Sequence, residues 1–364
     1  MNRRQFFIGG GAIAAVGAGA TIISTDQMGS QSDYDQATLA MRARLSPDPV
    51  GQDLIRYATL APNGHNTQPW LFTLGPQRIA IRPDFTRRTP AVDPDDHHLF
   101  VSLGCAAENL ALAAAARGQS GEFRFDDTGD GALDFAYSEG ATSPSALFDA
   151  IPGQQSTRAE YDGRQVSAGD LNTLAAAAKI PGVDMVIITD RPAMNRMRDL
   201  VVAGNITQMD DLAFIRELKS WLRFSPQKAL RTGDGLYSAT SGNPALPEWL
   251  GPIMFDMAFT SKSENDKYAN QIRSSAGLAV FVGARNDREH WTLTGRACQR
   301  FALQATALGL KHAFINQPVE VAALRSELAA LVGMEGRRPD IVMRFGYGPT
   351  LPYSARRPVE SVIA

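Results

Sequence analysis

Residues 61–72 read Ala-Pro-Asn-Gly-His-Asn-Thr-Gln-Pro-Trp-Leu-Phe and separate a helical pattern from an apolar strand. The apolar residues before this stretch recur near the helical period, at Leu54, Ile55, Ala58 and Leu60. The sequence Pro62–Gly64 is typical of a helix end. Polar side chains from Asn63 to Gln68 offer hydrogen-bond donors and acceptors, and Trp70 offers a rigid apolar wall. Two interpretations follow, a helix-capping turn with a buried Trp or a loop that binds a flat, polar-edged heterocycle.

The loop resembles the flavin-contacting loop of the nitroreductase family, in which a Pro-Ser-Ser-x-Asn-x-Gln-Pro-Trp pattern contacts FMN. The matching residues are Pro62, Asn66, Gln68, Pro69 and Trp70. Asn63 and Gly64 replace the two serines, which removes any hydroxyl contact at those positions. The sequence resembles in particular the Acg-like branch of single-chain FMN-binding proteins, from about residue 50 to the C-terminus. The resemblance implies FMN contacts at Pro62, Asn63, Gly64, Asn66, Gln68 and Trp70.

Composition places the chain among ordinary globular proteins, with 364 residues of which 44% are hydrophobic. A formal charge of -2 provides no general basic field, so nucleic acid and anionic membrane surfaces are not expected partners. The two cysteines, Cys105 and Cys298, each lie in an Ala-rich helical pattern. Buried free thiols are expected, and a disulfide stays open for an exported chain.

The N-terminus carries Arg3-Arg4-Gln5-Phe6-Phe7, followed by a Gly- and Ala-rich apolar run to Ile23. This pattern predicts a twin-arginine export signal over residues 1–24, with Ala18-Gly19-Ala20 as the cleavage site. The expected partner is the twin-arginine export machinery, the expected location is periplasmic or extracytoplasmic, and the processed chain is not expected to insert stably into a membrane. An uncleaved anchor is the alternative. The polar residues 25–48 are predicted to form a linker.

The run Asp93-Pro94-Asp95-Asp96-His97-His98 places carboxylates and imidazoles side by side, as a metal site would. Adjacent residues on a helix diverge in direction, whereas metal ligands usually converge at i, i+3 or i+4 spacing. Acidic residues in a first helical turn are favoured by the helix dipole. The run is therefore interpreted as a helix start, and no metal is predicted.

Residues 101–118 form a small-residue helical pattern that recurs 191 positions later. The identical pairs place Gly104, Ala106, Ala111, Leu112, Ala114, Ala116 and Gly118 on Gly295, Ala297, Ala302, Leu303, Ala305, Ala307 and Gly309. The preceding aromatic also matches, because Phe100 falls on Trp291. We interpret the pattern as an internal duplication. In nitroreductases this helix is central to an obligate dimer, so the resemblance implies a monomer that imitates a dimer, with the two helices at a pseudo-twofold interface.

The two predicted halves cover residues 49–150 and 151–364, joined by a Gly-, Asp- and Ser-rich connector. The second half begins with Gln154-Gln155-Ser156-Thr157-Arg158, which resembles the family's Arg-x-Ser-x-Arg phosphate signature with Gln154 in place of the first Arg. In an extended segment, Ser156 and Arg158 can point at one phosphate, where charge-assisted hydrogen bonds are strong. Taken alone the motif is common, and a turn before a strand is the alternative.

Residues 225–270 combine repeated Gly and Pro with aromatic and Met residues. Long irregular segments of this composition are often covers, so we predict a lid over the flavin. A surface loop without a role in access is the alternative.

Two further segments are assigned by resemblance. Phe314, Ile315, Asn316 and Gln317 correspond to the family segment whose backbone lies along the isoalloxazine and approaches its N5. This chain lacks the family's usual side chains there, but backbone donation does not depend on them. The resemblance also implies that Arg356, Arg357 or both reach the flavin phosphate; a solvated basic end is the alternative.

The sequence therefore predicts an α+β, nitroreductase-like fold with a central, mostly antiparallel sheet, surrounding helices and two unequal halves forming a pseudo-dimer. The resemblance implies an FMN-dependent oxidoreductase that reduces a small organic acceptor by two electrons, with the donor unidentified. The flavin carries the chemistry, so no catalytic side chain is nominated. A flavin-binding or sequestering protein with little or no turnover is the alternative. One FMN per chain is expected, because neither Met41–Arg44 nor Phe224–Pro226 supplies a convincing second site.

Overall fold

The computed structural model describes residues 28–364, so the predicted export signal at residues 1–24 lies outside the described part. An N-terminal helix α2 (Gln31–Met41) precedes the first half. The first half contains α3 (Gly51–Thr59), β1 (Trp70–Gly75), β2 (Arg78–Pro83), α4 (His97–Ala115), β3 (Gln119–Asp126), β4 (Ala132–Glu139) and α5 (Ala146–Ala150).

The second half begins with α6 (Ala168–Ala177) and β5 (Val183–Ile188). A long insertion follows, with α7 (Arg191–Asp210), α8 (Leu212–Trp221), β6 (Leu222–Arg223), α9 (Pro226–Thr232), β7 (Leu236–Tyr237), α10 (Gly251–Ala258) and α11 (Ser261–Arg273). The half then closes with β8 (Gly277–Gly283), α12 (Arg288–Ala307), β9 (Lys311–Phe314), α13 (Gln317–Glu320), α14 (Arg325–Leu331) and β10 (Ile341–Gly346).

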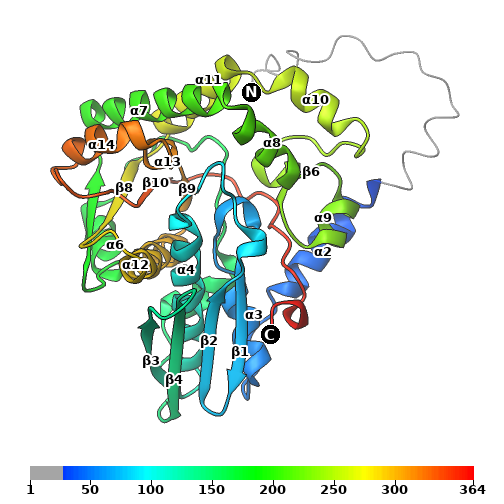
Figure 1. Ribbon diagram of the computed structural model, residues 1–364, viewed down its shortest axis with the longest axis vertical. Coiled ribbons are helices and arrows are strands. Elements are labelled where there is room, and N and C mark those ends of the chain that lie inside the picture. Colours follow the sequence, from blue (N-terminus) through cyan, green and yellow to red (C-terminus); the bar gives the residue numbers. More distant parts are fainter. Residues whose placement is uncertain (1–27) are drawn as a thin grey trace, which may run out of the picture.

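The main strands form two antiparallel sheets of four strands, ordered β1-β2-β4-β3 and β5-β8-β10-β9. The predicted α+β architecture with antiparallel sheets and two unequal halves is confirmed. The strands divide between the halves instead of forming one central sheet, and the helices α4 and α12 lie between the two sheets (Figure 1). A short parallel pair, β6 and β7, lies in the insertion.

The two halves repeat one topology. Each runs helix, strand, strand, helix, strand, strand, so that α3-β1-β2-α4-β3-β4 corresponds to α6-β5-β8-α12-β9-β10. The spatial order of the strands is also the same in both sheets. The second strand follows the first through a tight hairpin at Gly75–Arg78 in the first half, but through residues 189–276 in the second.

The repeated helices α4 and α12 pack against each other through their repeated glycines. A Cβ at Gly104 would lie 2.0 Å from the Thr292 carbonyl oxygen, and a Cβ at Gly295 would lie 2.0 Å from the Val101 carbonyl oxygen. Two positions 191 residues apart therefore form one crossing, because only glycine allows such a close approach of backbones. Helix α4 is long and apolar enough to span a membrane, but most of it is buried, as expected of a core helix.

The polar contacts between α4 and α12 are also buried. Glu108 accepts hydrogen bonds from Arg296 and Arg300, at 2.8 and 2.7 Å. Cys105 and Cys298 are both buried and free, with their sulfur atoms 3.6 Å apart. The structure thus has the expected buried thiols.

The predicted linker at residues 25–48 is wrong over α2. Ser30 caps this helix, and Tyr34 is fully buried against Tyr237, with ring centroids 4.5 Å apart. The Tyr34 hydroxyl donates to the Tyr353 carbonyl and accepts from the Ala355 N–H. Distant partners at the C-terminus thus order a stretch whose own composition suggested a tether.

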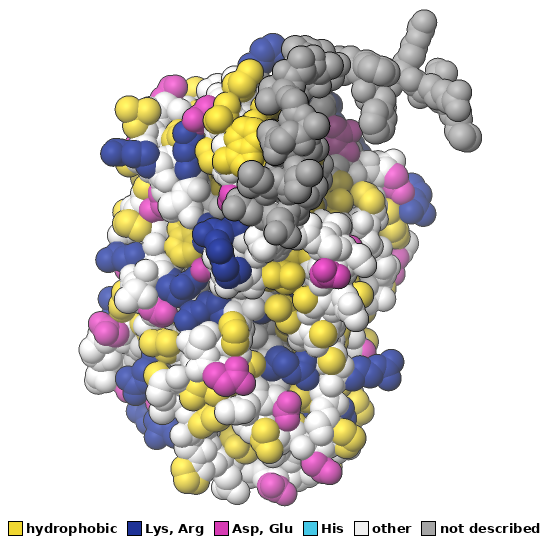
Figure 2. All heavy atoms as spheres, turned by 90° about the vertical axis from the view of Figure 1, so that its right-hand side faces the viewer, with side chains coloured by type: hydrophobic (Ala, Val, Ile, Leu, Met, Phe, Trp, Pro, Cys, Tyr) yellow, Lys and Arg dark blue, Asp and Glu magenta, His cyan; other side chains and the backbone are white. Residues whose placement is uncertain are grey.

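Residues 225–270 are also more regular than predicted, because α9, β7, α10 and most of α11 fall within them. Hydrophobic side chains gather at the upper end of the face that carries α10 (Figure 2). Helix α10 is largely exposed, with only Gly251 buried. The apolar composition that suggested a lid is therefore turned outward in α10.

Candidate functional site

The loop that follows α3 has a strained backbone. His65, Asn66 and Gln68 adopt left-handed φ angles of 46°, 54° and 54°. They are three of the five residues other than glycine with positive φ in the described chain. Such conformations cost of order 1–3 kcal/mol each and cluster at ligand and active sites. The strained backbone therefore makes this loop a candidate ligand site.

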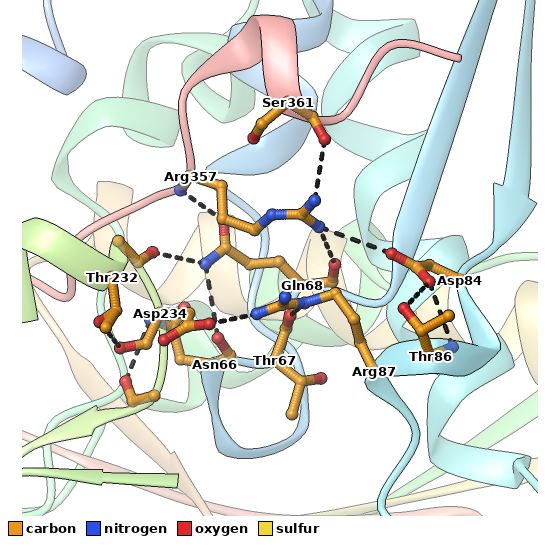
Figure 3. A network of polar contacts seen from close by, with 12 residues as sticks. Asn66, Thr67, Gln68, Asp84, Thr86, Arg87, Thr232, Asp234, Arg357 and Ser361 are labelled. Carbon is orange, nitrogen blue, oxygen red and sulfur yellow. Dashed lines mark hydrogen bonds and ion pairs between the residues drawn. The ribbon is translucent and has the colours of Figure 1, made fainter.

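Four segments hold this loop in place (Figure 3). Asn63 accepts a hydrogen bond from the Gln68 N–H at 2.8 Å. The Gln68 side chain donates to the Gly233 carbonyl and accepts from the Arg357 N–H, at 2.8 and 2.9 Å. Asp234 forms ion pairs with Arg87 and Arg223. Arg87 also donates a hydrogen bond to the Thr67 carbonyl. The strain is offset by these charged and buried contacts.

Asn66 and Arg356 join the loop to the C-terminal tail. Asn66 donates to the carbonyls of Gly235 and Ala355, both at 3.1 Å. Its side-chain oxygen accepts from Arg356 at 3.0 Å. The same guanidinium donates to the carbonyls at the end of α3, those of Thr59, Leu60 and Ala61. Burial lowers the pKa of Arg356 to about 9. Its contacts indicate a structural role, so a phosphate contact of Arg356 stays a prediction.

Arg357 has similar contacts. It donates to the Gln68 carbonyl at 3.3 Å and to the Ser361 carbonyl at 2.8 Å, and its guanidinium lies 3.7 Å from Asp84. The tail continues to β1, where the Phe72 N–H donates to the Val362 carbonyl at 2.7 Å. Arg357 thus fastens the tail to the loop, and its phosphate contact also stays a prediction.

Ser156 and Arg158 lie on an extended segment beside β9. Ser156 forms an isolated parallel bridge with His312, and the Thr157 N–H donates to the His312 carbonyl at 2.8 Å. Two-residue spacing in this segment directs both side chains to one side. Neither the Ser156 hydroxyl nor the Arg158 guanidinium has a hydrogen bond or ion pair with any other described residue. Both side chains are partly buried.

A second buried cation organises the same segment. Arg344 is fully buried and donates to the carbonyls of Thr157 and Ala159, at 3.1 and 2.8 Å. Its guanidinium stacks on the Tyr161 ring, 4.1 Å from the centroid. Burial lowers the pKa values of both Arg158 and Arg344, and the charge of Arg158 lowers the pKa of Arg344 further. No carboxylate among the described residues pairs with either guanidinium, so the segment favours an anion.

His65 connects the loop with Arg158. Burial, followed by the charges of Arg158 and His98, lowers the pKa of His65 to about 4. The imidazole is therefore neutral at pH 7, and its buried Nδ1 has no partner. The charge of Arg158 in the second half thus acts on His65 in the loop of the first half, and their place in one flavin site stays a prediction.

The segment Phe314–Gln317 passes from β9 into α13. The Ile315 N–H donates to the Val342 carbonyl, and the Asn316 side chain accepts from the Val342 N–H, both at 2.9 Å. Among the described residues, the N–H groups of Asn316 and Gln317 donate to no acceptor. The Gln317 Oε1 is also buried without a partner. This turn therefore offers two backbone donors and one amide acceptor.

The insertion covers the same turn. A Cβ at Gly204 in α7 would lie 2.7 Å from the Gln317 Cβ. In α11, Tyr268 interacts with Gln317 and with the charge of Arg158, while burial raises the pKa of its hydroxyl. Gln271, also in α11, donates to the Arg158 carbonyl at 2.5 Å. The elements nearest the predicted site are therefore α7 and α11, whereas α10 contributes none of these contacts.

Comparison with known proteins supports the family resemblance. The chain matches no protein-family profile. It is 27% identical over 339 residues to a Mycobacterium tuberculosis H37Rv protein with the name "Putative NAD(P)H nitroreductase", covering 89% of this chain and 94% of that protein. It is 24% identical over 329 residues to "Putative NAD(P)H nitroreductase acg" of the same strain, covering 86% and 95%.

The resemblance to the Acg-like nitroreductases is confirmed. Among solved structures, the chain aligns with a Desulfitobacterium hafniense nitroreductase with bound FMN at 15% identity and a TM-score of 0.38, covering 59% of this chain and 96% of that one. It aligns with the FMN-dependent nitroreductase NfnB of Mycobacterium smegmatis at 12% identity and a TM-score of 0.37, covering 56% and 87%.

The acid- and histidine-rich run at residues 93–98 is a helix start, as predicted. Asp93 accepts from the N–H groups of His98 and Leu99, at 3.0 and 2.9 Å. The ligand atoms of Asp93, His97 and His98 lie within 4.8 Å of one another. His97, however, pairs with Asp340 at 2.7 Å, and both oxygens of Asp93 accept backbone hydrogen bonds. The three side chains thus lie close together, each with protein partners of its own, and the absence of a metal stays a prediction.

The remaining predicted residues differ in position. Pro62, Asn63 and Gly64 lie at the outer side of the loop, and no atom lies within 4 Å of a Cβ added at Gly64. Trp70 is fully buried in the core on β1, although its Nε1 has no partner. A cavity of about 1170 Å³ lies elsewhere, over the outer face of β3 and β4, and contains none of the predicted site residues.

Sequence reasoning missed three neighbours of the site, namely His65, Tyr268 and Arg344. His65 belongs to the quoted loop, but no family position marks it. Arg344 interrupts the apolar strand β10, and a buried arginine in such a strand signals a fixed polar partner. Tyr268 carried no local signal, because its place depends on how α11 packs on α7.

Proposed function

We propose that this chain binds FMN at the junction of the loop at residues 62–68, the segment Ser156–Arg158 and the turn Phe314–Gln317, and that it is an oxidoreductase. The observation that carries the proposal is the Arg158 guanidinium, which is partly buried beside a free hydroxyl and has no anionic partner among the described residues. A buried cation without a partner is unfavourable. A phosphate would relieve that cost.

The available groups fit the parts of FMN. Ser156 and Arg158 match a phosphate in charge and hydrogen-bonding type. The free N–H groups of Asn316 and Gln317 and the unpaired Gln317 Oε1 suit the polar edge of a heterocycle. The strained loop, which carries the unpaired His65 Nδ1, faces Arg158 from the other half. FMN would thus be held by both halves.

Bound FMN would supply the two-electron redox chemistry. The protein residues have binding and orienting roles. Arg344 holds the backbone of the Thr157–Ala159 segment, so that Arg158 is positioned before the ligand arrives. Neutral His65 adds no charge to this cationic region. Helices α7 and α11 limit the access of water to the Gln317 turn. The acceptor is a small organic molecule of unassigned structure.

The second candidate function is flavin binding or sequestration with little or no turnover. The packing of α7 and α11 over the Gln317 turn favours it, because a cover that excludes water also hinders a second substrate. The proposed twin-arginine export also favours it, since a nicotinamide donor is not expected outside the cytoplasm. The relatives are named NAD(P)H nitroreductases, so NADH and NADPH are the donors to test first.

Arg158→Ala tests the binding site. Loss of a charge-assisted contact costs about 1.5–3 kcal/mol, so FMN affinity measured by titration of the apoprotein should fall by about one to two orders of magnitude. Arg164→Ala is the matched control, because Arg164 lies on the same segment, its side chain is 67% exposed, and among the described residues it contacts Asp162 and the Tyr347 ring. Equal affinity in the Arg158 variant and the wild type would remove Arg158 from the site.

Donor specificity separates the two functions. The holoprotein is mixed anaerobically with dithionite, NADH, NADPH or a quinol, and flavin absorbance is followed by stopped flow. An oxidoreductase is reduced by a biological donor and is reoxidised by a nitroaromatic or quinone acceptor. Reduction by dithionite alone would favour sequestration and would contradict the enzymatic part of the proposal.

A further inference from the structure

Helix α10 has a sequence that does not suit its surroundings. Its eight residues, Gly-Pro-Ile-Met-Phe-Asp-Met-Ala, include one charge, yet only Gly251 is buried. Trp249, Ile253 and Met257 are 62%, 52% and 71% exposed. A spacing of four residues places them along one side of a helical segment. A helix that is apolar all round is normally buried, so this stripe requires a partner.

The N-terminal segment enters the fold at the base of α10. Gly29 lies against Gln227 in the first turn of α9, where a Cβ would be 2.9 Å from Gln227. One turn earlier, the Ser225 N–H donates to Glu248 at 2.8 Å, and the Phe224 carbonyl accepts from the Leu246 N–H at 2.9 Å. The contact of Gly29 with Gln227 therefore lies two to three residues from Phe224 and Ser225, which bind the segment that leads into α10.

The chain before this point is strongly apolar. From Phe6 to Ile23 it contains no charged residue, and these residues lie outside the described part. The five steps from Ile23 to Met28 span at most about 18 Å. A bilayer that holds the apolar run would therefore lie close to α9 and α10.

We propose that α10 is a membrane-surface helix, which lays Trp249, Ile253 and Met257 into the bilayer interface while the apolar run at residues 6–23 is retained. Trp favours the interface because it has an apolar body and a polar N–H. A short apolar helix binds weakly by itself, and a tether in the same membrane raises its effective concentration. The contact thus depends on the unprocessed form of the chain.

A protein partner or the chain's own N-terminal run would match the exposed stripe of Trp249, Ile253 and Met257 less well than a bilayer does. Three large side chains expose a few hundred Å², whereas stable protein interfaces bury about 1,200–2,000 Å². The apolar run contains Gly9, Gly10, Gly11, Gly17 and Gly19. Glycine is a poor helix former in water, so this run is a poor packing partner for α10 outside a membrane.

The lipid headgroup should matter little. Lys219 pairs with Asp256 beside α10, and Lys262 and Lys267 pair with Asp266 and Glu264 in α11. These pairs leave no net basic field around the stripe. Binding should therefore be similar on zwitterionic and anionic bilayers.

The test follows the fluorescence of Trp249 in the full-length protein, taken as the difference between wild type and Trp249→Phe. The other tryptophans are more buried, so acrylamide mainly quenches Trp249 in detergent. Reconstitution into phosphatidylcholine vesicles should reduce acrylamide quenching by about half or more, and brominated lipid should quench the same signal. Vesicles with added phosphatidylglycerol should give the same result.

Ile253→Lys with Met257→Lys should abolish both changes, because charges at the stripe disfavour the interface. Val50→Lys is the matched control, since Val50 is 63% exposed at the start of α3. Continued acrylamide access of Trp249 in vesicles would overturn the proposal. Protection of Trp249 from acrylamide in the absence of vesicles would also overturn the proposal. If that protection increased with protein concentration, a second copy of the chain would cover the stripe; if it did not, the chain's own N-terminal segment would.

Discussion

The two halves share one topology but differ in three places that matter for the site. After its first helix, the first half has the strained loop over residues 60–69, whereas the second has the tight connection Ala-Lys-Ile-Pro-Gly at residues 178–182. Between its first two strands, the first half has a hairpin and the second has residues 189–276. The core topology is thus the same in both halves, while the loops at its ends differ.

The third difference concerns two arginines. Arg158 precedes the first helix of the second half, and its guanidinium has no hydrogen bond or ion pair within residues 28–364. Arg42 precedes the first helix of the first half, and its guanidinium has several protein partners. Arg42 donates to the carbonyls of Pro152 and Gln154, at 3.1 and 3.3 Å, and stacks 4.2 Å from the Tyr353 ring centroid. Protein groups thus satisfy one cation, and the other is left for a ligand.

The shared core gives the largest expected effect. Gly104→Ala and Gly295→Ala should each destabilise the protein by about 3 kcal/mol or more, because the new Cβ would lie 2.0 Å from a carbonyl oxygen of the facing helix. Equal losses of unfolding free energy in urea for the two variants would show that α4 and α12 contribute equally to the close crossing. Gly140→Ala is the control, since no atom lies within 4 Å of its added Cβ. A loss below about 1 kcal/mol in either core variant would contradict the close packing.

The start of α4 depends on a carboxylate from the other half, and this gives a pH effect. Burial raises the pKa of Asp340 to about 6, so its contribution to stability is complete below 3.8 and is lost as pH rises through 6. Burial lowers the pKa of its partner His97 well below 6.5, so the His97 contribution is present at neutral pH and is lost as pH falls. Over the pH range in which both groups titrate, acidification therefore raises the stability contribution of Asp340 and lowers that of His97.

Asp340→Asn removes the titrating carboxyl group, so that only His97 of this pair contributes to the pH dependence of stability. The unfolding free energy of the variant should fall on acidification below pH 6.5 by up to about 1.4 kcal/mol per pH unit more than that of the wild type. Thermal or urea unfolding between about pH 6.5 and 4 measures this slope. The corresponding α12 residue, Arg288, contacts the Gly129 carbonyl and the Phe100 ring, and Arg288→Gln should leave the slope unchanged. Parallel pH profiles for Asp340→Asn and wild type would refute the coupling.

The arginine comparison predicts opposite outcomes for two similar substitutions. Arg42→Ala should lower the unfolding free energy of the apoprotein by about 1.5–3 kcal/mol, because carbonyls lose a charged donor. Arg158→Ala should leave it within about 0.5 kcal/mol of the wild-type value or raise it, because no bond is lost and an unpaired cation is removed. In FMN titration the order should be the opposite, with a larger loss of FMN affinity for Arg158→Ala than for Arg42→Ala. A destabilised Arg158 variant with unchanged FMN affinity would show that Arg158 is structural.

Sequence reasoning succeeded where periodicity and close packing determine the structure. The repeated helices were found because Gly104 and Gly295 must be small at a shared crossing. The pairing of Ser156 with Arg158 in one phosphate site rests on their two-residue spacing in an extended segment and stays a prediction. Sequence reasoning failed over α2, where burial of Tyr34 depends on Tyr237 and the C-terminal tail. Strand β3 was not predicted, because its first four residues are polar or glycine and only Phe123 and Phe125 alternate as apolar residues.

The C-terminal arginines, Arg356 and Arg357, show a further limit of prediction from sequence. Resemblance assigned Arg356 and Arg357 by motif, but motif matching does not reveal which acceptors are already nearby. In the fold, Arg356 lies among the carbonyls that end α3, where its donors are used. The mirror loop was likewise sought near Phe224–Pro226, whereas the shared topology places it at residues 178–182. Both outcomes depend on contacts between residues distant in the chain.

The smallest expected effect is the absence of a second flavin. A mirror site would need a free cation before α3 and a polar loop before β5, but Arg42 is engaged and residues 178–182 offer only Lys179 as a polar side chain. The saturated protein should therefore contain one FMN per chain, measured by flavin absorbance against protein concentration. Lys179→Ala should leave both the ratio and the FMN affinity unchanged, in contrast to Arg158→Ala. Two FMN per chain would show that the halves are functionally equivalent and would overturn the division of roles between them.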